Sequence, residues 1–213
     1  TFGFPRIQTP VESTALFGSL TWRFSDQWSA SVEARAESES QEFNQAPTVT
    51  AGVPAGNSSL VVFDLDQDFN FVSPRVVIDY KPSDDLMFYF SGSRGVKAGG
   101  FNTNLRIFDN QRTYDEESQT MFEIGAKSTW LDGRLNANLA VYTSDWDDQQ
   151  IACQNPVSAF PGATSTQRTY VCNVGQAEIE GAEFDIAFAL SEALTLQGGY
   201  TYTDARYTAF LDD

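Results

Sequence analysis

The chain has 213 residues, 14% of them aromatic, and a formal net charge of −16 at pH 7. This charge repels phosphate backbones and argues against nucleic-acid binding, while the absence of histidine excludes Ser-His and Cys-His nucleophile pairs and histidine-based zinc or iron sites. No run approaches the roughly 18 apolar residues of a transmembrane helix, but a transmembrane β-strand needs only about 9–11 residues.

The first predicted hairpin covers residues 13–42. Residues 13–24 alternate apolar Leu16, Leu20 and Trp22 with polar side chains, and residues 28–42 return with Val32 on one face and mostly charged residues on the other. This period of two indicates strands, joined by a short turn at residues 25–27. Trp22 and Trp28 flank that turn, as in the aromatic girdle of a membrane interface. The alternative is the core edge of a soluble sheet.

A second hairpin follows a long connection at residues 43–67, which contains two prolines and is longer than an ordinary loop. Residues 69–80 and 86–101 form the predicted strands, and residues 81–85 form the turn. Pro74 predicts a bulge or a local break, because proline cannot donate to a ladder.

The clearest alternation lies in the third hairpin, within residues 114–151. Phe122 and Ile124 alternate with polar or small residues, and Leu131, Asp132 and Gly133 form a tight turn that Gly133 can close with a positive φ. Apolar residues then alternate with Arg, Asn and Ser on the return strand. A fourth hairpin near the C-terminus turns at residues 191–193.

The two cysteines bracket an 18-residue segment rich in Pro, Gly, Ser and Thr. No CxxC spacing suggests a metal or redox motif. We predict that Cys153 and Cys172 form a disulfide across the base of a surface loop, in an oxidising compartment. The alternative is two buried free thiols.

The connections divide into short turns near residues 26, 83, 132 and 192 and long segments at the other end. Outer-membrane barrels have this asymmetry, whereas sandwiches distribute loop lengths more evenly. We therefore predict an all-β fold, an antiparallel up-and-down transmembrane β-barrel segment of about eight strands in four hairpins. The residues expected to face lipid are Phe122, Ile124, Leu135, Leu139, Val141, Phe184, Ile186 and Phe188; those expected to face the lumen are Glu123, Lys127, Asn136 and Asn138.

Three stretches in order resemble the barrel of TonB-dependent outer-membrane receptors of the iron-complex, or siderophore, type. They are YFSGSRGVKAGGFN at residues 89–102, YDEE at 114–117 followed by FEIGAK at 122–127, and NVGQA at 173–177 followed by IEGAE at 179–183. The likeness covers about residues 13–208. Members of this family have a plug domain and a barrel of about 22 strands, so residues 1–213 are expected to be one partial barrel domain, with the plug and the remaining strands outside it.

The resemblance implies energy-coupled import of a scarce nutrient, most specifically a ferric siderophore, across the outer membrane of a Gram-negative bacterium. It implies no enzymatic activity and no cofactor. The implied partners are outer-membrane lipid and lipopolysaccharide, a small-molecule ligand such as a ferric siderophore, and the TonB-ExbB-ExbD complex acting through the plug. Two alternatives remain: a small complete eight-stranded outer-membrane adhesin or structural barrel, and a soluble secreted carbohydrate-binding β-domain.

Few residues are candidates for ligand binding. Arg94, Lys97 and Asn102 lie toward the loop end of their strand, where the cations could attract an anionic ferric chelate; the alternatives for Arg94 and Lys97 are lipopolysaccharide phosphates or lumen ion pairs. Asp64, Asp66 and Asp68 have alternating oxygen ligands, but they lack the glycine and distal glutamate of an EF-hand loop. We predict no metal site and no catalytic residue, and we expect the edge strands near residues 16 and 200 not to pair.

Overall fold

The computed structural model describes residues 6–46, 63–103, 107–155 and 169–209, and it contains one large antiparallel sheet. The strands of this sheet are β1 (Arg6–Gln8), β2 (Val11–Arg23), β3 (Trp28–Ala46), β4 (Phe63–Ser83), β5 (Leu86–Lys97), β8 (Glu117–Trp130), β9 (Leu135–Asp147), β12 (Gln176–Ser191) and β13 (Leu194–Ala209). β1 and β2 pair with successive parts of β3, so the sheet is eight strands wide. The predicted all-β fold is confirmed.

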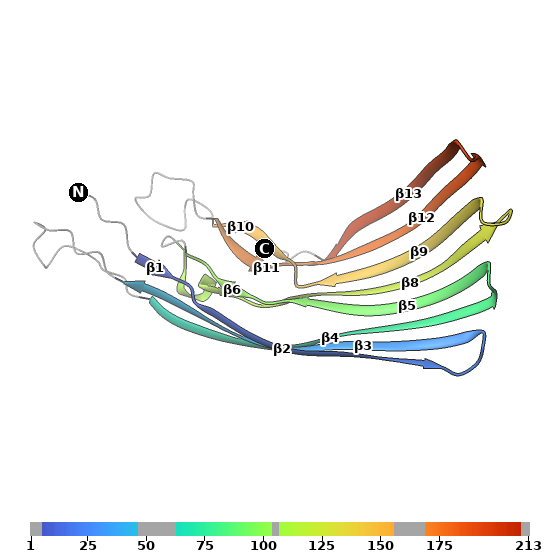
Figure 1. The fold of residues 1–213 in the computed structure, drawn as a ribbon. Helices are drawn as coiled ribbons and strands as arrows, with labels where there is room; N and C mark the ends of the chain where they lie inside the picture. The colour runs from blue at the N-terminus through green and yellow to red at the C-terminus, as the bar shows by residue number, and fades with distance from the viewer. Residues whose placement is uncertain (1–5, 47–62, 104–106, 156–168, 210–213) are drawn as a thin grey trace, which may run out of the picture.

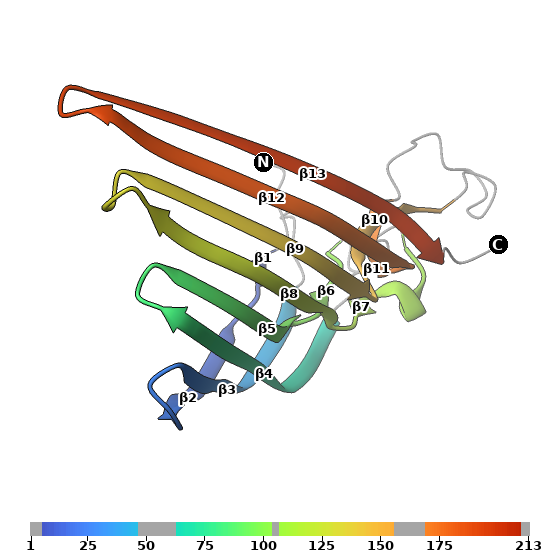
Figure 2. The ribbon, with the colours of Figure 1, turned by 90° about the vertical axis from the view of Figure 1, so that its right-hand side faces the viewer.

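The sheet is curved and open (Figures 1 and 2). Each long strand pairs with its neighbour in chain order, from β2 and β3 at one edge to β12 and β13 at the other. Among the residues that the structure describes, no ladder joins β2 to β13. The expected absence of closure is therefore confirmed, and the pairing does not support a complete eight-stranded barrel.

Four tight turns join the long strands at one end, where the sequence predicts them. The third turn has three successive residues with positive φ: Leu131 at 56°, Asp132 at 55° and Gly133 at 85°. The Arg134 backbone N–H donates to the Leu131 carbonyl at 3.3 Å and closes the turn. Gly133 thus has the predicted backbone conformation, while Leu131 and Asp132 adopt a left-handed conformation that non-glycine residues seldom take.

The cross-strand register separates two faces as predicted. Ile124 pairs with Val141, which pairs with Ala182, whereas Lys127 pairs with Asn138, which pairs with Asp185. Directly paired residues share a face, so the apolar and polar sets lie on opposite sides. The apolar side chains are solvent-accessible, with Ile124 62% exposed, as expected of a surface that contacts lipid.

Aromatic rings form a continuous ladder on the apolar face at the tight-turn end. Trp28 stacks on Tyr80 with ring centroids 4.4 Å apart, and Tyr80 lies 6.5 Å from Phe88. The Phe24 ring lies between the two tryptophans, with its centroid 5.3 Å from that of Trp22 and 6.2 Å from that of Trp28. The two tryptophans therefore lie beside the first turn as predicted, and amphipathic rings at this level are typical of a membrane interface.

Two short hairpins that the sequence analysis did not predict lie at the other end of the sheet. They are β6 (Gly100–Phe101) with β7 (Thr113–Tyr114), and β10 (Gln150–Gln154) with β11 (Thr169–Asn173); the short 3-10 helix η1 (Asp109–Gln111) precedes β7. Figure 1 shows them on the inner side of the curve. Phe101 stacks on Phe43 of β3 with centroids 5.8 Å apart, so the polar face is the concave one.

The second hairpin differs from the prediction in two ways. β3 runs to residue 46 and β4 begins at residue 63, so both ends of the predicted loop at 43–67 are strand. Residues 47–62 lie outside the described residues. Pro74 causes no bulge against β3, where it pairs with Ala34. The ladder between β4 and β5 instead begins at Arg75, the next residue, consistent with the missing proline N–H.

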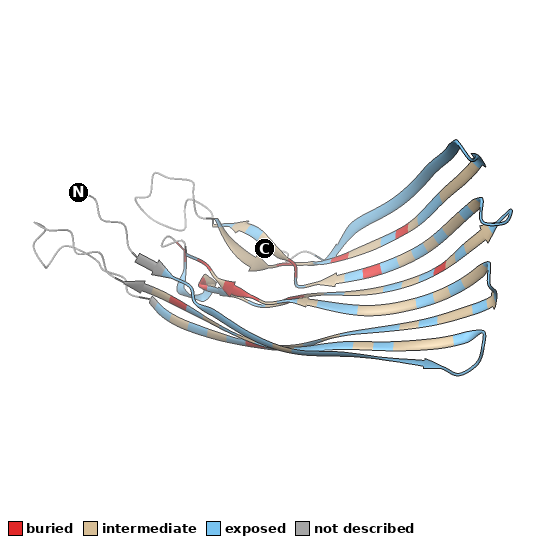
Figure 3. Ribbon diagram, viewed as in Figure 1, coloured by how far each residue is buried: buried red, intermediate tan, exposed pale blue. Residues whose placement is uncertain are grey.

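Burial is concentrated where the short hairpins cover the sheet (Figure 3). The buried apolar residues are Phe43, Phe69, Ile107, Val174 and Ala177. Gly99 shows how closely the chain packs there, because a Cβ at this position would meet the Tyr114 carbonyl and the Phe69 ring. Across the described ranges, no helix has the length and apolar character needed to cross a membrane.

Candidate functional site

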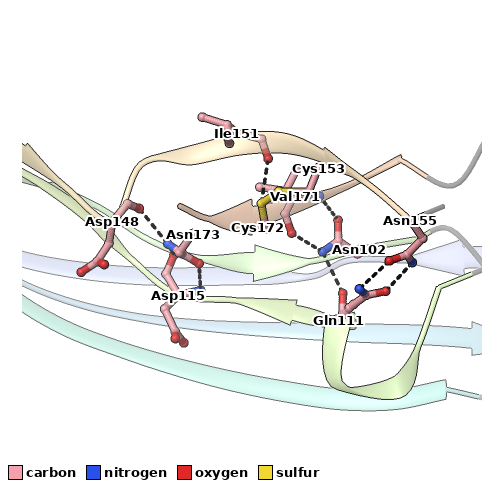
Figure 4. The surroundings of a disulfide bond; sticks show 10 residues. All are labelled: Asn102, Gln111, Asp115, Asp148, Ile151, Cys153, Asn155, Val171, Cys172 and Asn173. Atoms are coloured by element: carbon pink, nitrogen blue, oxygen red, sulfur yellow. Dashed lines mark hydrogen bonds between the residues drawn. A yellow bond between two sulfur atoms is a disulfide. The ribbon is translucent and has the colours of Figure 1, made fainter. Parts of the chain in front are cut away.

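The candidate site lies at the loop end, on the concave face, beneath the β10–β11 hairpin. A disulfide between Cys153 and Cys172 joins these two strands, with Cα atoms 5.9 Å apart (Figure 4). Cys153 pairs with Tyr170 and Cys172 pairs with Ile151, so the bridge runs diagonally across the ladder. The predicted pairing of the two cysteines is present in the structure.

Asn102 connects the two short hairpins. Its side-chain Nδ2 donates to the Gln111 carbonyl at 2.9 Å and to the Val171 carbonyl at 2.7 Å, and its Oδ1 accepts from the Val171 N–H at 2.7 Å. Asn102 is only 5% exposed. Nearby, the Gln111 and Asn155 side-chain amides bond each other at 2.9 and 2.7 Å. These bonds hold both loops together as one unit (Figure 4).

Asn173 attaches this unit to the start of β8. Its Nδ2 donates to the carbonyls of Asp115 and Asp148, both at 2.9 Å, and its Oδ1 accepts from the Asp115 N–H at 2.7 Å. The Gln150 side chain donates to the carbonyl of Ala98 at 2.8 Å. Side chains thus satisfy backbone groups between these separate segments, which no ladder joins among the described residues.

Lys97 belongs to an ion pair on the concave face. Its Nζ lies 3.0 Å from Glu117 Oε1, and the Gln150 backbone N–H donates to Glu117 Oε2 at 2.7 Å. The Glu117 side chain is 9% exposed, but that of Lys97 is 65% exposed. The buried carboxylate therefore fixes the position of an ammonium that remains accessible.

Arg94 lies on the opposite face of the same strand. Residues 94 and 97 are an odd number apart, so their side chains point to opposite sides, and Arg94 shares its side with Phe90. Its Nη2 bonds Ser118 Oγ at 3.4 Å. The structure thus brings Lys97 and Asn102 to the loop end of the concave face, and it separates Arg94 from them.

Three further residues of the site, Glu117, Trp146 and Gln150, were not predicted from the sequence. All three lie where a long strand meets a short hairpin. For Gln150 the available signal was the polar pair Gln149-Gln150, two residues after β9 ends at Asp147; the other two residues had no such signal.

Other charged candidates lie away from this site. In the ladder between β3 and β4, Asp66 pairs with Glu42 and Asp68 pairs with Ser40. These residues lie on the same face as Val72, which is opposite the concave face. Among the described residues, no group of three or more His, Cys, Asp or Glu side chains is placed to hold a metal ion. Arg112 is 7% exposed, and burial lowers the pKa of its guanidinium, with Asp109 opposing that effect.

Comparison with known proteins decides the family. The family model described as TonB dependent receptor-like, beta-barrel, matches residues 3–213. The chain belongs to this family. The resemblance found in the sequence is confirmed.

Two curated relatives of this chain carry the names of receptors. The probable TonB-dependent siderophore receptor PiuA of Acinetobacter baumannii is 25% identical over 210 residues, covering 96% of this chain and 25% of that protein. The metal-pseudopaline receptor CntO of Pseudomonas aeruginosa is 26% identical over 198 residues, covering 93% and 25%. The chain thus spans about a quarter of the length of the curated relatives it matches.

A solved structure shows the same fold. The ferric-catecholate import receptor Fiu of E. coli K12, in its closed form, superposes with a TM-score of 0.69 at 18% identity. The match covers 97% of this chain and 29% of that one. At this identity the match shows a shared fold, a curved antiparallel sheet eight strands wide.

Proposed function

We propose that this chain is part of the barrel wall of a TonB-dependent receptor that imports a scarce nutrient, most specifically a ferric siderophore. The observation that supports this proposal is the family match over residues 3–213, together with an open sheet whose two faces differ in polarity. An apolar outer face suits lipid, and a polar inner face suits a wet lumen. PiuA and CntO carry the names of a siderophore receptor and a metal-pseudopaline receptor.

The proposal also assigns surroundings and partners. The protein lies in the outer membrane of a Gram-negative bacterium, with lipid and lipopolysaccharide against the apolar face and a plug domain in the lumen. The TonB-ExbB-ExbD complex supplies energy through that plug. Binding and transport are its activities, rather than catalysis, and it requires no cofactor.

The three ligand candidates take different roles in this proposal. Lys97 faces the lumen and contacts the ligand, whereas Arg94 meets headgroup phosphates on the outer side. Asn102 contributes through the two loops that it joins, because its amide bonds both of them.

The test is uptake of radiolabelled iron by cells that express the complete natural gene under iron limitation. We expect import of at least one ferric siderophore, lost when the gene or tonB is deleted. Wild-type cells that import no ferric chelate beyond the level of the deletion strain would contradict the proposal. Fractionation checks the location, and recovery outside the outer membrane would also contradict it.

A further inference from the structure

A cavity of about 470 Å³ lies between the concave face and the root of the β10–β11 hairpin. Ala177 and Ile179 of β12 line it, together with the rings of Trp146 and Tyr207. Trp146 pairs with Ala177, and Ala177 pairs with Tyr207. The small Ala177 side chain therefore lies between two aromatic residues on the same face, which leaves a hollow between the rings. Its volume is in the usual range for small-molecule sites, about 300–1,000 Å³.

The polar groups of this cavity converge from three elements. Lys97 comes from the end of β5, Glu117 from the start of β8 and Gln150 from the start of β10. The Glu117 carboxylate accepts hydrogen bonds from the Lys97 ammonium and from the Gln150 backbone N–H. A nearly buried carboxylate therefore holds the Lys97 ammonium in position. An ammonium has three N–H donors, and Glu117 takes one of them. The remaining donors can bond oxygen atoms in the cavity.

A second cation lines the cavity but is directed elsewhere. Arg206 has its guanidinium nitrogens 3.1 Å from Glu178 and 3.8 Å from Asp204. These two acidic residues lie on the opposite face, because Glu178 pairs with Arg206 beside Ala177. Of the described cations that line the cavity, Lys97 is therefore the one positioned to contact a ligand.

We propose that this cavity is a ligand subsite that takes an aromatic group bearing anionic oxygen, such as a phenolate of an iron chelate. The rings of Trp146 and Tyr207 supply flat apolar surfaces, and the Lys97 ammonium supplies charge-assisted hydrogen bonds. This inference rests on the proposed function, because it specifies which part of the transported chelate the wall recognises. Neither a neutral aliphatic chelate nor a bare metal ion satisfies the cavity equally well.

The experiment uses the purified complete receptor and two probes, the anionic ferric complex of 2,3-dihydroxybenzoate and a neutral ferric trihydroxamate. Binding is measured by titration calorimetry. We expect Lys97→Gln to weaken binding of the aromatic probe by about tenfold or more, the magnitude expected for a lost charged hydrogen bond. Lys97→Arg should retain binding within about threefold, since the charge and donors remain. Arg94→Gln, on the opposite face of β5, is the matched control and should have no effect.

Two variants of Trp146 test the contribution of its ring to binding of the aromatic probe. Trp146→Ala should weaken the aromatic probe, whereas Trp146→Phe should preserve most of its affinity. No variant should alter the affinity of the trihydroxamate. Folding of each variant is checked by heat-modifiable gel mobility.

Several outcomes would overturn the subsite. They are absence of aromatic-probe binding by the wild type, equal losses in Lys97→Gln and Arg94→Gln, or equal losses for both probes. Cellular iron uptake tests the proposed function independently of this binding experiment. A receptor that imports a hydroxamate chelate but does not bind the aromatic probe would retain the function and exclude this subsite.

Discussion

At the scale of single residues, Asn102 shows how one amide replaces a backbone ladder. Among the described residues, the two short hairpins that it joins form separate sheets and do not pair with each other, so backbone groups between them need side-chain partners. Asn102 supplies two donors and one acceptor to them. Its position within the motif of residues 89–102 therefore has a structural reason, which is independent of any ligand.

We predict that Asn102→Asp destabilises the short hairpins. The change removes both N–H donors and places a carboxylate against two carbonyl oxygens, which should cost about 2–4 kcal/mol in local stability. Hydrogen exchange of the Val171 amide measures the effect. Asn136→Asp is the control, because Asn136 is exposed and its Oδ1 accepts from Thr129, as a carboxylate also can. Equal exchange in both variants would contradict the structural role.

At the scale of elements, the disulfide restrains the β10–β11 hairpin. The bridged cysteines are 19 positions apart, and their ladder is only five residue pairs long. A short ladder has few contacts of its own, so the cross-link limits how far the strands can separate.

Replacing both Cys153 and Cys172 by Ser should lower the local stability of this hairpin by about 3 kcal/mol, from the loop-closure entropy that the bridge removes. Hydrogen exchange at Ile151 and Ala152 should accelerate, whereas amides in β8 and β9 should not change. Mass mapping of the wild type under non-reducing conditions provides the second check. Two free thiols in protein from its native compartment would refute the pairing.

The register of β8 provides another prediction at this scale. Ile124→Arg puts a charge on the apolar face and should cost about 2–4 kcal/mol if the residue lies near the bilayer midplane. Asn138→Arg puts the same charge on the concave face and should cost much less. Urea-dependent folding of the complete receptor into lipid vesicles measures both. A greater loss for Asn138→Arg would show that the faces are inverted.

At the scale of the whole molecule, the open edges dominate the behaviour of this segment. β2 and β13 each pair on one side, as far as the described residues show. Unpaired backbone groups in a bilayer cost several kcal/mol each, so a wall of this kind needs neighbouring strands on both sides.

We therefore expect the isolated 213-residue chain to aggregate rather than to form a native barrel, and to transport nothing. Size-exclusion chromatography after refolding in detergent, with hydrogen exchange of the β2 and β13 backbones, tests this. A monodisperse monomer in which both edge strands are protected would contradict it. Such a closed eight-stranded barrel would have an interior wide enough only for side chains.

The sequence by itself determined the long strands, their turns and their two faces, because alternation and turn residues are local properties. It also predicted the cysteine pair and the family. Tertiary structure alone decided that Glu117 holds the Lys97 ammonium at a cavity that Trp146 also lines. These contacts join β5, β8, β9 and β10, so they depend on strand order, curvature and loop folding. Periodicity within one segment carries no information about such contacts, which explains why the β6–β7 and β10–β11 hairpins were missed.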